Sequence, residues 1–248
     1  MTPSPVPPAY YTRADGVRLA FRHTKGSGPT IVFLPGYMSD MNGGKALAVE
    51  AWAIKNRRAM LRLDYAGCGE SEGDFAEATF DGWRDDVIAM IELIVRGPVI
   101  LLGSSMGGWL MLMIALVLKT DVKAIVGIAA APDFTDWGFS DFQRATIFRD
   151  GVIYQDNPYG PEPTPSFAKL FKSGQSNRML TGDINITCPV RLLHGQCDGD
   201  VPWDVSMQLA ARLRSSDVQI SLIKDGDHRL SRDTDIRMLL DILAALPN

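Results

Sequence analysis

The chain has 248 residues, of which 46% are hydrophobic and 22% charged, and its formal net charge is −4. This composition supports one sizeable core, and a negative balance without a basic patch argues against a nucleic-acid partner. The three cysteines are unpatterned, so no disulfide framework is expected. The longest apolar run, Trp109 to Leu118, is about half the length of a bilayer span, and we expect no membrane span.

Short apolar or alternating segments predict strands in chain order. They lie at residues 17–24, 30–35, 59–64, 98–103, 122–130, 189–194 and 217–223. Apolar residues from Trp83 to Ile94 recur at helical spacing, and a last helix is expected after Ser231 as its cap. Alternation of strands and helices predicts an α/β fold with a mostly parallel, doubly wound sheet.

A Gly-x-Ser-x-Gly pentapeptide follows the strand at 98–103. Gly103-Ser104-Ser105-Met106-Gly107 leads from that strand into the apolar helical run that starts near Trp109. The pentapeptide alone is weak, because an ordinary glycine-rich turn has the same composition. Its place between a buried strand and a core helix predicts the sharp turn that exposes a nucleophilic serine. Ser105, the central residue, is the predicted nucleophile.

Residues 133–187 interrupt the alternation. About 55 residues separate two strong strands, which is too long for a plain connection in a compact domain. We therefore expect a single domain over 1–248 with a small cap insertion at about 133–187. The insertion is rich in aromatic residues: Phe134, Trp137, Phe139, Phe142, Phe148, Tyr154, Tyr159, Phe167 and Phe171. They could line an apolar substrate pocket, with Trp137 and Phe142 as contacts, or form the core of the cap itself.

Two carboxylates follow the strand at 189–194. Asp198 and Asp200 lie just past the carboxyl end of that strand, where open α/β sheets build their sites. Either could orient an imidazole, and spacing alone does not decide between them, since Asp-Gly is also a common turn signal. A metal site is disfavoured because no histidine or glutamate cluster at ligand spacing accompanies them. We expect no metal and no cofactor.

Three histidines compete for the role of general base. His23 precedes the serine on an outer strand, and a structural role is expected for it. His194 ends an apolar run, ahead of any downstream acid. His228 lies in a loop between the last strand and the last helix, which satisfies the chain order serine, acid, histidine of hydrolases with this turn. His228 is the predicted base, the alternative being a solvated loop histidine.

These motifs together resemble the α/β-hydrolase superfamily. The resemblance rests on Gly-x-Ser-x-Gly at 103–107, Asp-Tyr-Ala-Gly-Cys-Gly-Glu-Ser at 64–71, and His-Gly-x-x-Asp-x-x-Val-Pro at 194–202. More narrowly, residues 34–43, 103–112 and 188–195 are similar to the branch of palmitoyl-protein thioesterases and acyl-glucuronide esterases. The similarity runs from about Val17 to the last helix, apart from the segment at 133–187.

The resemblance implies site residues and a reaction. In the family pattern the acid is Asp198, and Tyr37 supplies one oxyanion N–H beside that of Met106, the residue after the nucleophile. The implied reaction is attack of Ser105 on an ester or thioester carbonyl to give an acyl-enzyme, with a small acyl ester or thioester, or an acylated protein, as the partner. Carbon–carbon bond hydrolases and cofactor-free haloperoxidases keep the same triad and stay open, as does a ligand receptor on a hydrolase scaffold.

The location expected from the sequence is the cytoplasm. The first eight residues have neither a basic region nor an apolar region of a secretory signal. The branch's animal members carry an organelle-targeting extension that has no counterpart here, which favours a bacterial cytoplasm.

Overall fold

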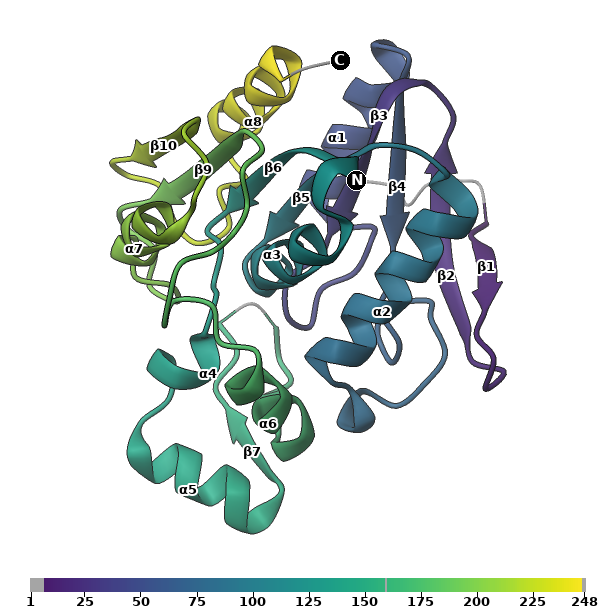
Figure 1. The fold of residues 1–248 in the computed structure, drawn as a ribbon. Helices are drawn as coiled ribbons and strands as arrows, with labels where there is room; N and C mark the ends of the chain where they lie inside the picture. Colours follow the sequence, from purple (N-terminus) through teal and green to yellow (C-terminus); the bar gives the residue numbers. More distant parts are fainter. Residues whose placement is uncertain (1–6, 159, 247–248) are drawn as a thin grey trace.

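The computed structural model describes residues 7–158 and 160–246. Eight strands form one sheet in the order β1-β2-β4-β3-β5-β6-β9-β10 (Figure 1). Their bounds are β1 Ala9–Thr12, β2 Arg18–Thr24, β3 Ser27–Leu34, β4 Arg58–Leu63, β5 Val99–Ser104, β6 Val122–Ile128, β9 Val190–Gly195 and β10 Val218–Ile223. Strands β1 and β2 run antiparallel at one edge, and all the other pairings in this sheet except β2 with β4 are parallel.

The seven strands predicted from the sequence are all present, with ends displaced by a few residues at most. Strand β1 was not predicted because it has four residues and only one of them is even half-buried. The central strand β5 is buried at every position, as expected for a strand covered on both faces. The mostly parallel α/β fold is therefore confirmed.

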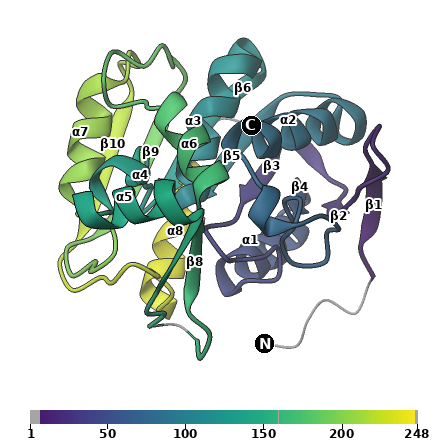
Figure 2. The ribbon, with the colours of Figure 1, turned by 90° about the horizontal axis from the view of Figure 1, so that it is seen from below.

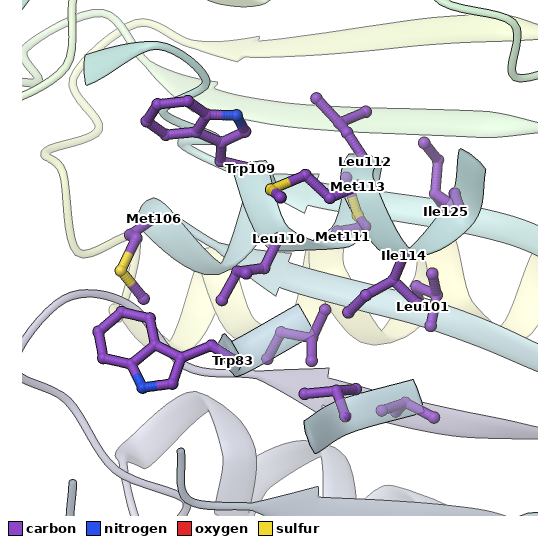
Figure 3. Close-up of a cluster of buried hydrophobic side chains, with 14 of the residues drawn as sticks. Trp83, Leu101, Met106, Trp109, Leu110, Met111, Leu112, Met113, Ile114 and Ile125 are labelled. Atoms are coloured by element: carbon purple, nitrogen blue, oxygen red, sulfur yellow. The ribbon is translucent and has the colours of Figure 1, made fainter. Parts of the chain in front are cut away.

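Helices cover both faces of the sheet (Figure 1). Their bounds are α1 Gly44–Lys55, α2 Phe80–Met90, α3 Met106–Leu118, α7 Asp204–Arg212 and α8 Asp233–Ala245. Helices α1 and α8 contribute to one buried cluster, while α2, α3 and α7 contribute to the other. Helix α3 is buried from Met106 to Ala115, and Figure 3 shows its side chains reaching toward both Trp83 and the strands.

The last helix begins one residue later than the sequence predicts. Arg232, and not Ser231, is the N-cap of α8, and both its backbone N–H and its guanidinium donate hydrogen bonds to the Asp235 carboxylate in the first turn. The guanidinium of Arg232 also binds Asp225, which joins the helix start to the loop that contains His228. The contacts of the Arg232 side chain with Asp235 and Asp225 therefore determine where this helix begins.

In its described residues, the segment between β6 and β9 has three helices and a separate pair of antiparallel strands. These elements are α4 Phe134–Trp137, α5 Asp141–Asp150, β7 Val152–Gln155, β8 Thr164–Phe167 and α6 Ala168–Ser176. They lie together at the end of the sheet where the parallel strands finish (Figures 1 and 2). Asp133, in a left-handed conformation, accepts the backbone N–H groups of Met179 and Leu180, and so joins the two ends of the segment. Tyr159 and residues 1–6, which include most of the start of the chain discussed above, lie outside the described residues.

Gly107 allows α3 to pack against the end of β3. A Cβ atom at this position would lie 2.1 Å from the carbonyl oxygen of Leu34 and 2.5 Å from that of Pro35. We expect Gly107→Ala to lower the free energy of unfolding by about 3 kcal/mol, because backbone atoms cannot yield as a side chain can. Gly199→Ala is the matched control, since no atom lies within 4 Å of its added methyl. Denaturant titration of both variants tests this, and equal stabilities would contradict the packing argument.

Candidate active site

Ser105 lies at the turn between β5 and α3. Its φ of 54° and ψ of −122° are strained for a residue with a side chain, as expected of a nucleophile at this kind of turn. Three hydrogen bonds hold its backbone: its N–H donates to Ile128 (2.9 Å), and its carbonyl accepts from Gly108 (2.8 Å) and Ala131 (3.0 Å). The end of β6 therefore fixes the position of this serine.

The structure brings Ser105, His228 and Asp198 into one hydrogen-bonded chain. His228 Nε2 lies 3.0 Å from the Ser105 hydroxyl, and His228 Nδ1 lies 2.8 Å from Asp198 Oδ2. Only 15% of the His228 side chain is exposed, and the Asp198 side chain is fully buried. This is the arrangement in which an imidazole can take a proton from a serine hydroxyl.

The two candidate carboxylates occupy different environments. Asp198 Oδ1 accepts the backbone N–H groups of Asp200 (2.9 Å) and Val201 (2.8 Å), so a turn holds the carboxylate against His228. Burial alone would raise the pKa of Asp198, but hydrogen bonds from His194 and His228 hold it well below its usual range. The Asp200 side chain is 39% exposed, and its Oδ2 is 4.0 Å from His228 Nε2, on the far side of the ring from Nδ1.

A cation could in principle be held by these groups. Ligand atoms of Asp198, Asp200 and His228 lie within 4.8 Å of one another. Both nitrogens of His228 are engaged by Ser105 and Asp198, however, so a metal would have to displace those hydrogen bonds. We assign no metal site here.

The loop after β3 passes directly beside the nucleophile. A Cβ atom on Gly36 would lie 3.3 Å from both the Ser105 Cβ and the Ser104 carbonyl oxygen, so the next residue, Tyr37, lies at the turn. Among the described residues, no hydrogen-bond acceptor is found for the backbone N–H of Tyr37 or of Met106. An oxyanion site requires two such N–H donors, so the assignment of Tyr37 and Met106 to this role stays a prediction.

The side chain of Tyr37 ties this loop to the segment between β6 and β9. Its hydroxyl donates to the Pro165 carbonyl at 2.6 Å, and its ring packs edge-on against Phe75 and Phe134. Burial raises the pKa of Tyr37 above its usual range. The side chain of Tyr37 therefore connects the loop after β3 to β8.

A pocket of about 560 Å³ opens at Ser105 and His228. One part of its lining is apolar and comes from Ala131, Phe134, Trp137, Phe139 and Val201. The other part is polar and includes Ser39, Lys45, Gln155, Asn157, Thr164, Ser166 and Ser231. A second hollow of about 600 Å³, between β9, β10 and α8, contains none of the residues of the hydrogen-bonded chain, so the chemistry belongs to the first.

The two predicted substrate contacts have different outcomes. Trp137 lines the pocket, and its indole N–H donates to the Pro132 carbonyl at 2.8 Å. Phe142 does not line it, and its side chain is 76% exposed. The capping box between Ser140 and Gln143 starts α5 so that Phe142, in its first turn, faces solvent. Phe142 is therefore corrected as a pocket residue.

Two residues that the sequence did not place at the site lie close to it. Lys45, in the first turn of α1, lines the pocket and donates to the Arg229 carbonyl, next to His228. Burial, and then the charge of Arg229, lowers the pKa of Lys45 to about 8. His194 is fully buried and hydrogen-bonds to Asp198, whereas His23 lies half-buried on β2. A lysine early in a helix is normally solvated, so no pattern marked Lys45.

Comparison with known proteins agrees with this architecture. A family model described as the alpha/beta hydrolase family matches residues 31–238. Human palmitoyl-protein thioesterase ABHD10 is 39% identical over 236 residues, which cover 94% of this chain and 77% of the relative. The mouse ABHD10 structure superposes with a TM-score of 0.89 at 38% identity, covering 96% of this chain and 97% of its own. A structure named as a hydrolase from Agrobacterium vitis S4 gives 0.91 at 34% identity, with 98% and 99% covered.

The same comparison corrects the expected location. The ABHD10 relatives are named as mitochondrial proteins, which contradicts the cytoplasmic location inferred from the sequence. Composition and the secretory-signal pattern bear on whether a protein is secreted, and they do not report targeting to an organelle. Among the described residues, no helix is both long and apolar enough to cross a membrane.

The match over residues 31–238 and the identity to ABHD10 show that the chain belongs to the alpha/beta hydrolase family, in the branch of the palmitoyl-protein thioesterases.

Proposed function

We propose that the protein hydrolyses carboxylic esters or thioesters through an acyl-enzyme on Ser105. The observation that supports this most directly is the hydrogen-bonded chain from the Ser105 hydroxyl through His228 to the buried carboxylate of Asp198. A serine is a weak nucleophile by itself, and an adjacent imidazole that is held in one orientation activates it.

The reaction has two steps in this proposal. His228 Nε2 takes the hydroxyl proton as Ser105 attacks the carbonyl carbon, and the N–H groups of Tyr37 and Met106 stabilise the oxyanion. His228 then gives the proton to the leaving alcohol or thiol, and Asp198 stabilises the intermediate imidazolium. Water, deprotonated by His228, attacks the acyl-enzyme and releases the carboxylic acid and free Ser105.

The substrate class follows from the pocket and the relatives. An apolar wall that includes Phe134, Trp137 and Phe139 suits an acyl chain, and the polar lining residues suit the group that leaves. Relatives named as palmitoyl-protein thioesterases favour a thioester, carried on a small molecule or a protein. In this proposal the segment at about 133–187 acts as a cap on a single domain, since it supplies the apolar wall.

Trapping the acyl-enzyme tests this function. Intact mass spectrometry after mixing with an acyl thioester, and separately with a p-nitrophenyl ester, should show one acyl group per chain that disappears as product forms. Prior treatment with a fluorophosphonate should block both reactions. A wild-type protein that neither labels with fluorophosphonate nor turns over any ester or thioester would contradict the proposal. Slow acylation without turnover would favour a ligand receptor instead.

Replacing Trp137 tests the acyl site. With wild-type protein, kcat/KM on p-nitrophenyl esters should rise with acyl length from acetyl, by up to about fourfold per methylene, because each buried methylene contributes about 0.8 kcal/mol. Trp137→Ala should flatten this slope and spare acetyl-ester activity, since the indole lines the pocket. Phe142→Ala is the matched control and should keep the wild-type slope. A preference for acetyl over every longer chain, or equal slopes in the two variants, would count against the apolar wall.

A further inference from the structure

The buried histidine of β9 has hydrogen-bond partners at both ring nitrogens. His194 has no exposed surface, yet its Nδ1 lies 2.7 Å from the Ser206 hydroxyl of α7. Its Nε2 lies 3.1 Å from Asp198 Oδ2 and 3.1 Å from the Val201 carbonyl oxygen. A second imidazole therefore contacts the same carboxylate oxygen that His228 contacts.

The partners determine where His194 carries its proton. Both groups facing Nε2 are acceptors, a carboxylate oxygen and a carbonyl oxygen, so Nε2 must be the protonated nitrogen. The neutral ring then accepts a hydrogen bond at Nδ1, and the hydroxyl of Ser206 can donate it. Ser206 is itself buried, so water does not compete for this position.

The Asp198 carboxylate is thereby saturated with donors. Two backbone N–H groups reach Oδ1, and His194 and His228 both reach Oδ2. An ionised carboxylate in a site closed to water needs such donors to stay ionised and to stay in one rotamer. Two imidazoles contact Oδ2, and of these His228 is the one that reacts, whereas His194 does not.

We propose that His194 is a positioning residue for the reaction. It donates its Nε2–H to Asp198 Oδ2, and so fixes the orientation of the carboxylate that orients His228 and offsets part of its negative charge. This inference rests on the proposed function, because it assigns His194 a role that acts through Asp198, the acid of that site. By sharing the negative charge of Oδ2, His194 weakens the hold of Asp198 on a proton at His228. His194 touches neither the pocket nor Ser105 in this arrangement.

Removing the donor should therefore change the pH profile as well as the rate. In His194→Ala, Oδ2 keeps one donor, its charge is less compensated, and it favours the protonated ring of His228 more strongly. The acidic limb of kcat/KM should move to higher pH by about half a unit to one unit, and kcat should fall by about tenfold. His194→Gln retains an N–H donor and should recover part of both effects.

Other charged groups near His228 stay in place in these variants. Asp200 faces Nε2 from the acid loop, and Asp227 and Arg229 flank the ring in sequence. Lys45 approaches from α1 through its bond to the Arg229 carbonyl. The substitutions at His194 leave all four of these residues unchanged, so a shift of the limb reports the lost donor.

Nitrogen NMR on 15N-histidine-labelled protein tests the arrangement directly, because the chain has three histidines. We expect His194 to show a protonated Nε2 and a bare Nδ1 throughout the pH range in which His228 titrates. Ser206→Ala should weaken the preference for this tautomer. The titration of His228 should move to higher pH in His194→Ala. This NMR measurement detects the shift without any enzymatic turnover. His23→Gln, on β2, is the matched control and should move neither the titration nor the limb.

The outcomes separate this inference from the proposed function. A protonated Nδ1 on His194, a His194 that titrates together with His228, or an unmoved titration of His228 in folded His194→Ala would each overturn the inference. Loss of activity in proportion to lost folded protein, with an unchanged limb, would reduce His194 to a structural role and also overturn it. A wild-type protein without any turnover would defeat the proposed function, and the NMR result would still decide whether His194 donates to Asp198.

Discussion

Ser105→Ala should abolish acyl-enzyme formation and lower hydrolysis by about 10⁴-fold to 10⁶-fold, because the proposed nucleophile is lost while the proposed oxyanion donors stay. Its hydroxyl lies 3.0 Å from His228 Nε2, and its backbone has a positive φ of 54° at the strained turn. Intact-mass analysis after fluorophosphonate treatment should show no adduct on the variant, and kcat on a p-nitrophenyl ester should fall to background.

The neighbouring serine offers the matched control. Ser104 is the last residue of β5, is 9% exposed, and is paired with Ile128 of β6. Ser104→Ala should therefore keep the fluorophosphonate adduct and most of the activity. Peptide mapping that placed the adduct on Ser104 would show that the wrong serine has been assigned. Circular dichroism of both variants should match the wild type.

Asp198→Asn should lower kcat by about 10³-fold to 10⁴-fold, whereas Asp200→Asn should cost less than about tenfold. In the proposed mechanism the carboxylate of Asp198 holds the proton of His228 on Nδ1 and stabilises the imidazolium, and a neutral amide cannot replace that negative charge. Asp200 is partly exposed and approaches His228 on the side that faces Ser105. Steady-state kinetics on one ester decides the matter, and greater damage from the Asp200 change would move the role of the acid to that residue.

The same substitution changes how stability depends on pH. The pKa of folded Asp198 is depressed, so its ionised form stabilises the fold above the pKa of the unfolded chain. That contribution is lost as pH falls through the folded value. The stability gap between wild type and Asp198→Asn should therefore be widest near neutral pH and should narrow in acid. Denaturant titrations at several pH values measure it, and a gap that widened in acid would contradict the depressed pKa.

Much of the fold could be predicted because it depends on local patterns. The buried strand β5, the apolar helix α3 and the glycines around Ser105 are contiguous in sequence, and their periodicity and conformational freedom are properties of the segment itself. The same holds for the seven predicted strands. The four-residue strand β1 was missed because its pattern is too short to distinguish from a loop.

The choice between Asp198 and Asp200 required the tertiary structure. Both follow β9 within a few residues, and only the turn that presents Asp198 Oδ1 to two backbone N–H groups decides which carboxylate faces His228. The family pattern favoured Asp198, but spacing alone left the two equal. Contacts between loops 30 residues apart in sequence have no local signature.

The direction of individual side chains was also beyond the sequence. Trp137 and Phe142 are both aromatic residues of one segment, yet one lines the pocket and the other faces solvent. The start of α5, fixed by its capping box, makes that difference. The hydrogen bond from the Tyr37 hydroxyl to β8 likewise depends on how that strand lies over the loop.

The sequence by itself determined the class of sheet, the turn that exposes Ser105 and the order of the catalytic candidates, because these follow from periodicity, glycine placement and chain order. Only the tertiary structure decided which carboxylate hydrogen-bonds to His228 Nδ1 and which aromatic residues line the pocket. It also brought His194 into hydrogen-bond contact with Asp198. Those features depend on burial and on hydrogen bonds between distant segments, and the free energy of such contacts exists only once the strands and loops have been brought together.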